Sequence, residues 1–417
     1  MTIRFDKLIK NTGIALDIIE KELLGAATHH GKRVAVLVDA MGRFFGLDDG
    51  TRKNLSICAL FHDNALSEYI LSERAGLAPH DPSMKLHCEL GQKNLEALLP
   101  GNISGYVLYH HEWANGQGPF GKREGECPLA AELICLADAT DVRHRYNCID
   151  PDKLPQLIDR IKNDRGIHFT NRAVEAACTV INEELLHSLS DDCIREALDR
   201  AIPPEEVDIQ NTMIIKFALL VSRIIDYKSA FTRRHTAQIA NKAWYMGNWY
   251  KWNDDRKAQF FLAASLHDLG KLAIPTEILE KPGALTPGEF LIIKDHVRIT
   301  WELLKDIEGM ETICDWASNH HEKLDGSGYH AGKGADKLDF NSRLLACIDI
   351  YQAVSEERPY HPGRTHRDTM GILFDMAGRG FIDGGIVNDL NMALQPFNGG
   401  DVPLPKILDL FNTPVGY

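Results

Sequence analysis

The chain has 417 residues, of which 44% are hydrophobic and 25% charged. This composition is ordinary for a globular protein and excludes wholesale disorder. Its length favours two or three domains over one. The 59 acidic residues outnumber the 46 basic ones and give a net charge of −13, which argues against a broad surface that follows nucleic-acid phosphates. We therefore expect no nucleic-acid polymer as a partner, and local charge has to capture any anionic ligand.

Cysteine usage and hydropathy indicate the compartment. The nine cysteines show no CxxC spacing, as expected of a reduced chain without a zinc ribbon. No run approaches 18 uncharged apolar residues, and the first residues lack the apolar stretch and cleavage site of a secretory signal. The sequence thus predicts a cytoplasmic protein with no membrane partner, and it leaves a homodimer as an open alternative.

Apolar residues recur at helical spacing along most of the chain, for example between Leu291 and Leu304, whereas alternating runs are scarce. This pattern predicts an all-α fold. Tandem prolines at Pro203 and Pro204 end one helix, and the acidic residues after them suit the first turn of the next. We therefore predict two domains, residues 1–204 and 205–417, with a buried helix from Val207 opening the second.

The two halves share an ordered series of histidine and aspartate residues, which we call marks. In the first half they are His30, His62, Asp63, His87, His110, His111 and Asp138. In the second half they are His235, His267, Asp268, His296, His320, His321 and Asp349. The offset between corresponding marks grows only from 205 to 211 residues, and a glycine-rich loop follows the paired histidines in each half. The chain is therefore predicted to be a tandem duplication of two helical bundle domains.

The second-half marks suit a pair of divalent metal ions, because imidazole and carboxylate both bind such ions and an aspartate can bridge two of them. His235, His267, Asp268 and Asp349 supply one site, and the three other histidines supply what a second ion needs. Two ions can hold a bridging hydroxide as the nucleophile and neutralise charge on a phosphoryl group. Nitrogen and oxygen ligands favour Fe or Mn, with Ni, Co or Zn as alternatives.

Other residues of the second half suit a phosphate ester at such a centre. Lys271 follows His267 and Asp268 by about one helical turn and can reach a phosphoryl oxygen as a point charge. Glycines 326 and 328 let backbone amides approach a ligand, and Arg358 can clamp a second phosphate.

At this point the sequence resembles a known family. The stretches HDLGKLAIP from His267, NHHEKLDGSGYH from Asn319 and RLLACIDIYQAVSEERPYHPGR from Arg343 look like the HD-GYP branch of the HD-domain metal-dependent phosphohydrolases. The similarity covers roughly residues 205–400, and its motifs are specific. It implies a bundle of five or more helices with a dinuclear centre. The implied reaction is hydrolysis of a cyclic dinucleotide, cyclic di-GMP or 3′,3′-cGAMP, to a linear dinucleotide by metal-bound hydroxide.

Residue by residue, the family's metal ligands fall on all seven second-half marks, from His235 to Asp349. We predict Asp268 and Lys271 as the catalytic residues. The predicted substrate contacts are Lys271, Gly326, Gly328, Tyr329, Arg358 and Arg364.

This chain departs from the family pattern at three positions. The Gly-Tyr-Pro that names the branch ends here in His330, so the loop lacks proline's fixed φ. Members with a third metal carry a glutamate where this chain has Phe231, so two ions are favoured over three. A basic residue that often follows the Arg-Pro-Tyr mark is His361 here, with Arg364 three residues later, so guanine specificity does not follow.

The first half resembles the same family more distantly. It keeps a full set of predicted ligands, but it lacks Gly and Lys after His62 and Asp63, and Asn115 and Pro119 replace residues of the glycine loop. Two interpretations stay open: a sensory or structural domain with degenerate chemistry, or a second phosphohydrolase site that releases phosphate from the linear product. Further metal could bind there in either case.

Two alternatives to the phosphodiesterase hypothesis remain. One is an HD phosphohydrolase of mononucleotides or nucleic-acid ends, against which the HHExxDGxGY loop counts. The other is a metal-bearing module that senses a nucleotide without turnover, against which the retention of Lys271 and all seven marks counts.

Overall fold

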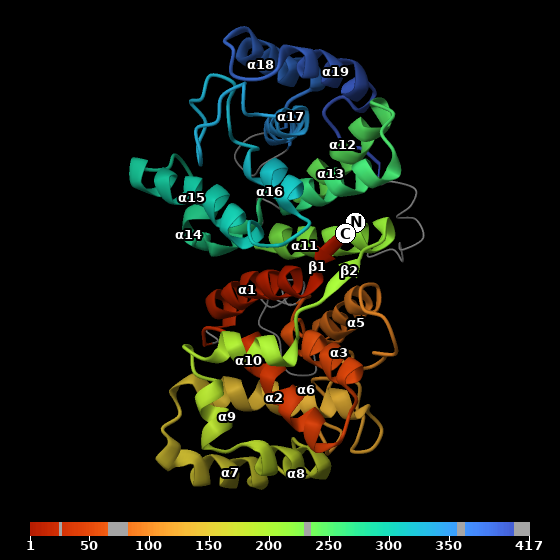
Figure 1. Ribbon diagram of the computed structural model, residues 1–417, viewed down its shortest axis with the longest axis vertical. Helices are drawn as coiled ribbons and strands as arrows, with labels where there is room; N and C mark the ends of the chain where they lie inside the picture. The colour runs from red at the N-terminus through yellow and green to blue at the C-terminus, as the bar shows by residue number, and fades with distance from the viewer. Residues whose placement is uncertain (25–26, 66–81, 229–234, 357–362, 404–417) are drawn as a thin grey trace. The chain divides into compact units, whose positions relative to one another are not determined.

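The computed structural model of the chain describes residues 1–24, 27–65, 82–228, 235–356 and 363–403. These residues are helical apart from turns, loops and one two-stranded sheet, which confirms the predicted all-α fold (Figure 1). None of the described helices is both long enough and apolar enough to cross a membrane.

The chain divides into two compact units. The first comprises Phe5–Glu206, and the second comprises Met1–Arg4 together with Val207–Tyr417. The boundary drawn from sequence, between residues 204 and 205, lies two residues from this division. It also left the first four residues in the wrong unit: β1 (Thr2–Arg4) pairs with β2 (Glu206–Asp208) and so belongs with the second unit.

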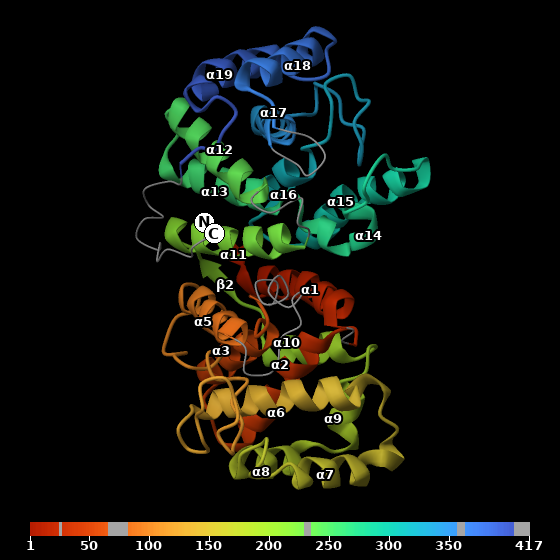
Figure 2. The same cartoon turned by 180° about the vertical axis from the view of Figure 1, so that it is seen from behind.

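The first unit is a helical bundle around a buried central helix. Its helices are α1 (Phe5–Leu24), α2 (His30–Phe44), α3 (Asp49–Leu60), α5 (Pro82–Glu96), α6 (Leu129–His144), α7 (Leu154–Asn163), α8 (Asn171–Val180), α9 (Glu183–Ser188) and α10 (Ile194–Ala201), with short 3-10 turns η1 (Tyr146–Cys148) and η2 (Pro151–Lys153). Helix α2 packs against α3, α6, α8 and α10, and nearly all of its side chains are buried. Helices α7 and α8 lie side by side (Figures 1 and 2).

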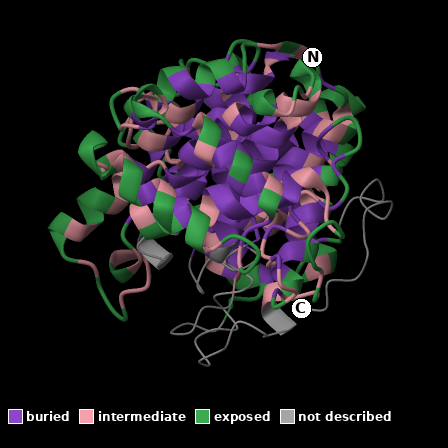
Figure 3. Ribbon diagram, turned by 90° about the horizontal axis from the view of Figure 1, so that it is seen from below, coloured by how far each residue is buried: buried purple, intermediate pink, exposed green. Residues whose placement is uncertain are grey.

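The second unit repeats this plan. Its helices are α11 (Asn211–Tyr227), α12 (His235–Trp249), α13 (Asp254–Leu266), α14 (Thr276–Leu279), α15 (Pro287–Leu304), α16 (Glu311–Ser318), α17 (Phe340–Ser355), α18 (His366–Gly378) and α19 (Gly384–Leu394), with 3-10 turns η3 (Leu269–Ala273) and η4 (Gln395–Phe397). Helix α13 packs against α11, α12 and α16, and α12 also packs against α17. Figure 3 shows the buried positions concentrated in the interior, with exposed positions on outward-facing turns.

One detail of the predicted elements is wrong. The segment after the tandem prolines begins with strand β2, and the buried helix begins only at Asn211. The acidic residues therefore precede a strand, whose partner is the distant N-terminal segment that local patterns do not reveal. The helical spacing between Leu291 and Leu304 corresponds to α15, whose buried residues include His296, Val297 and Thr300.

Candidate metal centres

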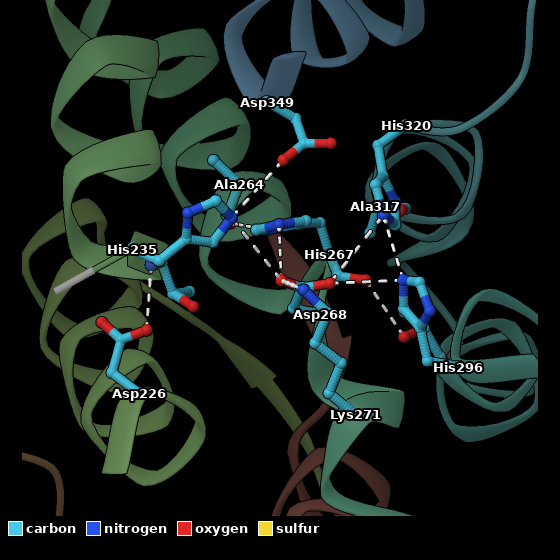
Figure 4. Close-up of polar contacts among 12 residues, drawn as sticks. Asp226, His235, Ala264, His267, Asp268, Lys271, His296, Ala317, His320 and Asp349 are labelled. Atoms are coloured by element: carbon cyan, nitrogen blue, oxygen red, sulfur yellow. Dashed lines mark hydrogen bonds and ion pairs between the residues drawn. The ribbon is translucent and has the colours of Figure 1, made fainter. Parts of the chain in front are cut away.

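The second unit gathers its seven predicted ligands from five places in the fold. The residues are His235 at the start of α12, His267 and Asp268 between α13 and η3, His296 on α15, His320 and His321 just after α16, and Asp349 on α17 (Figure 4). Six of them are buried, and His321 is partly exposed. Helices, helix ends and loops therefore all deliver ionisable side chains to one place inside the bundle.

The backbone fixes the orientation of three imidazoles. Nδ1 of His267, His296 and His320 lies 2.6 Å from the carbonyl oxygen three residues earlier, on Ala264, Ile293 and Ala317 respectively. A carbonyl oxygen only accepts, so each Nδ1 carries a proton and donates it. In a neutral ring the lone pair then belongs to Nε2, and this is the arrangement in which a histidine binds a metal.

Asp268 lies between two groups of histidines. Its Oδ2 is 3.1 Å from Nε2 of His267 and 3.9 Å from Nε2 of His235. Its Oδ1 is 3.3 Å from Nε2 of His296 and 3.9 Å from Nε2 of His320. Each carboxylate oxygen therefore serves a different group, as a carboxylate that bridges two ions would.

Asp349 connects the same two groups from the opposite side. Its Oδ1 is 3.5 Å from Nε2 of His235, and its Oδ2 is 3.6 Å from Nδ1 of His321. The donor atoms of His235, His267 and Asp268 lie within 4.8 Å of one another, as do those of His296, His320 and His321.

These residues fit metal ions because acceptor atoms face one another. The Nε2 atoms of His296 and His320 are 3.3 Å apart although both rings already donate through Nδ1. Burial and the neighbouring His321 hold the pKa of His320 well below its usual value, so that ring stays neutral. Nε2 of His267 is also buried, makes no hydrogen bond and faces a carboxylate oxygen. A cation among these atoms would turn the repulsion of facing lone pairs into coordination.

Charge inside the site favours ionised carboxylates. Burial opposes ionisation of Asp268, but His267 and Lys271 beside it hold the pKa of its carboxyl well below the usual range. Burial also opposes ionisation of Asp349, and a hydrogen bond from His235 lowers the pKa of that carboxyl. Burial lowers the pKa of His321 to about 3. The site thus favours anionic carboxylates at Asp268 and Asp349 and neutral imidazoles at His320 and His321, the protonation states that metal binding needs.

Lys271 is in contact with this centre. Its Nζ lies 2.6 Å from Oδ2 of Asp268, and its side chain is 18% exposed. Figure 4 shows the lysine reaching the carboxylate from η3. Lys271 therefore places a positive charge beside the predicted metal ligands while keeping a path to solvent.

One carboxylate near the site was missed by the sequence analysis. Oε2 of Glu356 lies 2.9 Å from Nδ1 of His235 and orients that ring toward Asp349. In the first unit, Asp141 makes the corresponding contact, with its Oδ2 2.7 Å from Nδ1 of His30. The two carboxylates follow the last mark of their half by seven and three residues, so no common spacing could reveal them.

A second missed residue, Glu322, anchors the glycine loop. Its buried carboxylate accepts hydrogen bonds from the backbone N–H groups of Ala331, Gly332 and Lys333 at 2.8 to 3.1 Å. A Cβ on Gly328 would lie 2.4 Å from Cα of Glu322, so only glycine lets the loop pack this closely. The glutamate after the two histidines could have suggested this role.

The loop also places Tyr329 and His330. The ring of Tyr329 lies 4.7 Å from that of His321, at the edge of the centre. Gly326 adopts a left-handed turn with φ of +78°. His330 has a φ of +103°, which proline cannot adopt, so the replacement of the family's proline goes with a different local backbone.

The remaining predicted substrate contacts are not joined to the centre. Arg364 is exposed, and within the described part of the chain it forms no hydrogen bond or ion pair with the seven ligands. Arg358, His361 and Phe231 lie outside the described residues.

The first unit gathers its own seven marks in a similar arrangement. His30, His62 and Asp138 form one group, and a second group contains His87, His110 and His111. Oδ1 of Asp63 is 3.1 Å from Nε2 of His87 and 3.8 Å from Nε2 of His110, while its Oδ2 is 3.6 Å from Nε2 of His62.

Backbone carbonyls also orient imidazoles in the first unit. Nδ1 of His62 donates to Ala59 and Nδ1 of His110 donates to Val107. The lysine of the second unit has no counterpart, because the residue three positions after Asp63 is Leu66. This unit therefore keeps a similar arrangement of the seven marks but has no lysine at the sequence position that corresponds to Lys271.

Comparison with known proteins identifies the second unit. Residues 219–386 match the HD domain family. The second unit therefore carries an HD domain. The HD domain contains all seven marks of the second unit, and the resemblance drawn from the sequence motifs is confirmed.

Curated relatives match this chain over different lengths. It is 27% identical over 369 residues to 3′3′-cGAMP-specific phosphodiesterase 1 of Vibrio cholerae, covering 85% of this chain and 84% of the relative. It is 31% identical over 163 residues to a cyclic di-GMP phosphodiesterase response regulator of Xanthomonas campestris, covering 39% and 43% respectively.

A solved structure shares the fold. A cyclic GMP-AMP specific phosphodiesterase of V. cholerae superposes with a TM-score of 0.63 at 20% identity, over 94% of this chain and 98% of that chain. The likeness spans both units, so the paired-bundle architecture is common to the two proteins.

Proposed function

We propose that this chain is a metal-dependent phosphodiesterase that opens the ring of a cyclic dinucleotide, cyclic di-GMP or 3′,3′-cGAMP, to give the linear dinucleotide. The observation that carries the proposal is the bridged double group of ligands around Asp268, with the ammonium of Lys271 beside it. The relatives, which are named for cyclic dinucleotide hydrolysis, support the substrate class.

The seven side chains would hold two divalent ions. His235, His267 and Asp349 serve one ion, His296, His320 and His321 serve the other, and Asp268 serves both through its separate oxygens. Bound ions of this kind polarise a phosphoryl oxygen and supply an ionised water at neutral pH. The nitrogen and oxygen donors favour Fe or Mn, with Ni, Co or Zn as alternatives.

Lys271 stabilises the charge that develops on phosphorus. One of its three N–H groups donates a hydrogen bond to Asp268, which holds the ammonium beside the centre. The other two N–H groups can donate to a phosphoryl oxygen. This positive charge lets a protein of net charge −13 attract an anionic diester locally.

The glycine loop would position the substrate. Glu322 fixes its backbone, and the Tyr329 ring beside His321 offers a flat surface next to the metal ligands. We propose Gly326 and Gly328 as the points where substrate approaches the loop backbone, and Arg358 and Arg364 as the partners of the second phosphate.

The test is hydrolysis of cyclic di-GMP, 3′,3′-cGAMP and cyclic di-AMP by the full chain reconstituted with Mn²⁺ or Fe²⁺, with products followed over time. We expect ring opening by the wild type and by a His62→Ala/Asp63→Ala variant, and no ring opening by His267→Ala/Asp268→Ala. The two variants are matched, because each removes the corresponding pair from one unit.

Three results would overturn the proposal. Equal ring opening by both variants would move the reaction away from the second unit. Hydrolysis of mononucleotides or nucleic-acid ends alone would favour the more general phosphohydrolase. Tight binding of a cyclic dinucleotide without turnover, with both ions present, would favour a sensor.

A further inference from the structure

The first unit differs from the second by a thiol in its metal-binding group. Sγ of Cys88 lies within 4.8 Å of donor atoms of His87, His110 and His111. The corresponding position in the second unit, directly after His296, is the buried Val297. Among the groups found in the described residues, this is the one that contains a cysteine.

Burial alone does not account for Cys88. A buried cysteine often acts as a small apolar side chain, and Cys88 on α5 is fully buried. This one, however, lies in the same group of potential ligands as His110. Nδ1 of His110 donates to Val107, and its buried Nε2 makes no hydrogen bond and lies 3.8 Å from the nearest oxygen of Asp63. An unpartnered buried acceptor next to a thiol and two further histidines is the environment of a metal ligand.

The group is also accessible. A cavity of about 210 Å³ in the first unit is lined by His110, His111 and Asp138, and by Trp113 and Gly118 of the glycine loop. The cavity therefore gives access to the group from the side of His110 and His111, whereas His87 and Cys88 do not line it.

We propose that the first unit holds a metal centre of its own in which Cys88 adds a thiolate to the histidine ligands. Thiolate selects softer ions than carboxylate does, so this unit prefers Zn²⁺, whereas the sulfur-free set of the second unit suits Fe or Mn. On binding, the ion takes the place of the thiol proton, which is released to solvent. The two units thus carry different metals, whether or not the second unit hydrolyses cyclic dinucleotides.

The experiment uses Co²⁺ as a spectroscopic probe of the metal-free full chain. Thiolate coordination gives a sulfur-to-cobalt charge-transfer band in the near ultraviolet that nitrogen and oxygen ligands do not give. We expect this band in the wild type and in His267→Ala/Asp268→Ala. It should be lost in Cys88→Val, which installs the residue of the other unit, and in Cys88→Ser.

The matched control is Cys135→Ala. Cys135 lines the cavity and is replaced by Ala346 in the second unit, but it does not belong to the group that contains Cys88. Its variant should keep the band. In competition with Mn²⁺, Cys88→Val should lower the zinc affinity of the first unit by at least about tenfold, since even indirect partners of a ligand are worth 10–100-fold.

Two outcomes would overturn the proposal. One is a charge-transfer band that survives in Cys88→Val. The other is a cobalt or zinc content that is unchanged by His110→Ala/His111→Ala, which removes two members of the group, in a protein with native circular dichroism.

Discussion

Replacing Glu322 by glutamine should loosen the glycine loop beside the predicted catalytic centre. The carboxylate is 3% exposed and accepts three backbone N–H groups, two through Oε1 and one, from Lys333, through Oε2. Glutamine keeps the shape but turns one acceptor oxygen into an NH₂ donor. At least one loop N–H is then left without an acceptor, and the others lose the help of a negative charge.

The size of the effect follows from these contacts. A hydrogen bond to a charged group contributes about 1.5–3 kcal/mol, so we expect local opening of the loop to become easier by about 2–3 kcal/mol. Each 1.4 kcal/mol is a factor of ten, which corresponds to roughly 30- to 150-fold faster amide exchange.

Hydrogen exchange measured by mass spectrometry on the peptide spanning residues 325–334 is the direct assay. The control variant is Glu302→Gln on α15, whose side chain is 42% exposed and pairs with Lys305. That substitution should leave the loop unchanged. Exchange in Glu322→Gln within about threefold of the wild type would refute the assignment of the carboxylate as the loop's anchor.

Three further predictions concern the second unit. Lys271→Met should retain the metal content and lower the rate of ring opening by about 10²–10³-fold, as removal of one charge-stabilising donor does. The control Lys305→Met should retain activity. Loss of metal in parallel with activity in Lys271→Met would contradict the assigned role. His330→Gly should preserve folding, and His330→Pro should lower the melting temperature because proline cannot adopt a φ of +103°. Burial opposes protonation of His235, but hydrogen bonds from its ring to two carboxylates, including Glu356, raise its pKa to about 9 in the metal-free protein. The stabilisation from this proton is complete below the unfolded pKa near 6.5 and is lost as pH rises through about 9. The difference in melting temperature between metal-free wild type and His235→Gln should therefore shrink between these two pH values. A difference that stays constant would refute this prediction.

The sequence predicted the all-α fold because the apolar spacing is dominated by the helical period, and the structure confirms it. It also selected, through the repeated order of marks, side chains that the structure brings together in each unit. Their role as metal ligands stays a prediction. The family resemblance depended on the same marks, and the comparisons confirm it.

The features that were missed depend on contacts distant in sequence. The strand β2 forms because the first residues of the chain pair with it, and no local pattern near Glu206 shows this. Glu356 could not be selected either, since carboxylates near a helix end are common and only the folded chain shows which one reaches His235.

The central claim is that the second unit opens cyclic dinucleotides with metal ions held around Asp268. The most direct measurement is metal titration of the metal-free His62→Ala/Asp63→Ala chain, in which two of the seven marks of the first unit are removed, with ring opening and the metal bound to the second unit followed together. We predict no hydrolysis without metal, and full hydrolysis of cyclic di-GMP or 3′,3′-cGAMP when two ions are bound per chain. Two bound ions with cyclic di-GMP, 3′,3′-cGAMP and cyclic di-AMP all left intact would contradict the account.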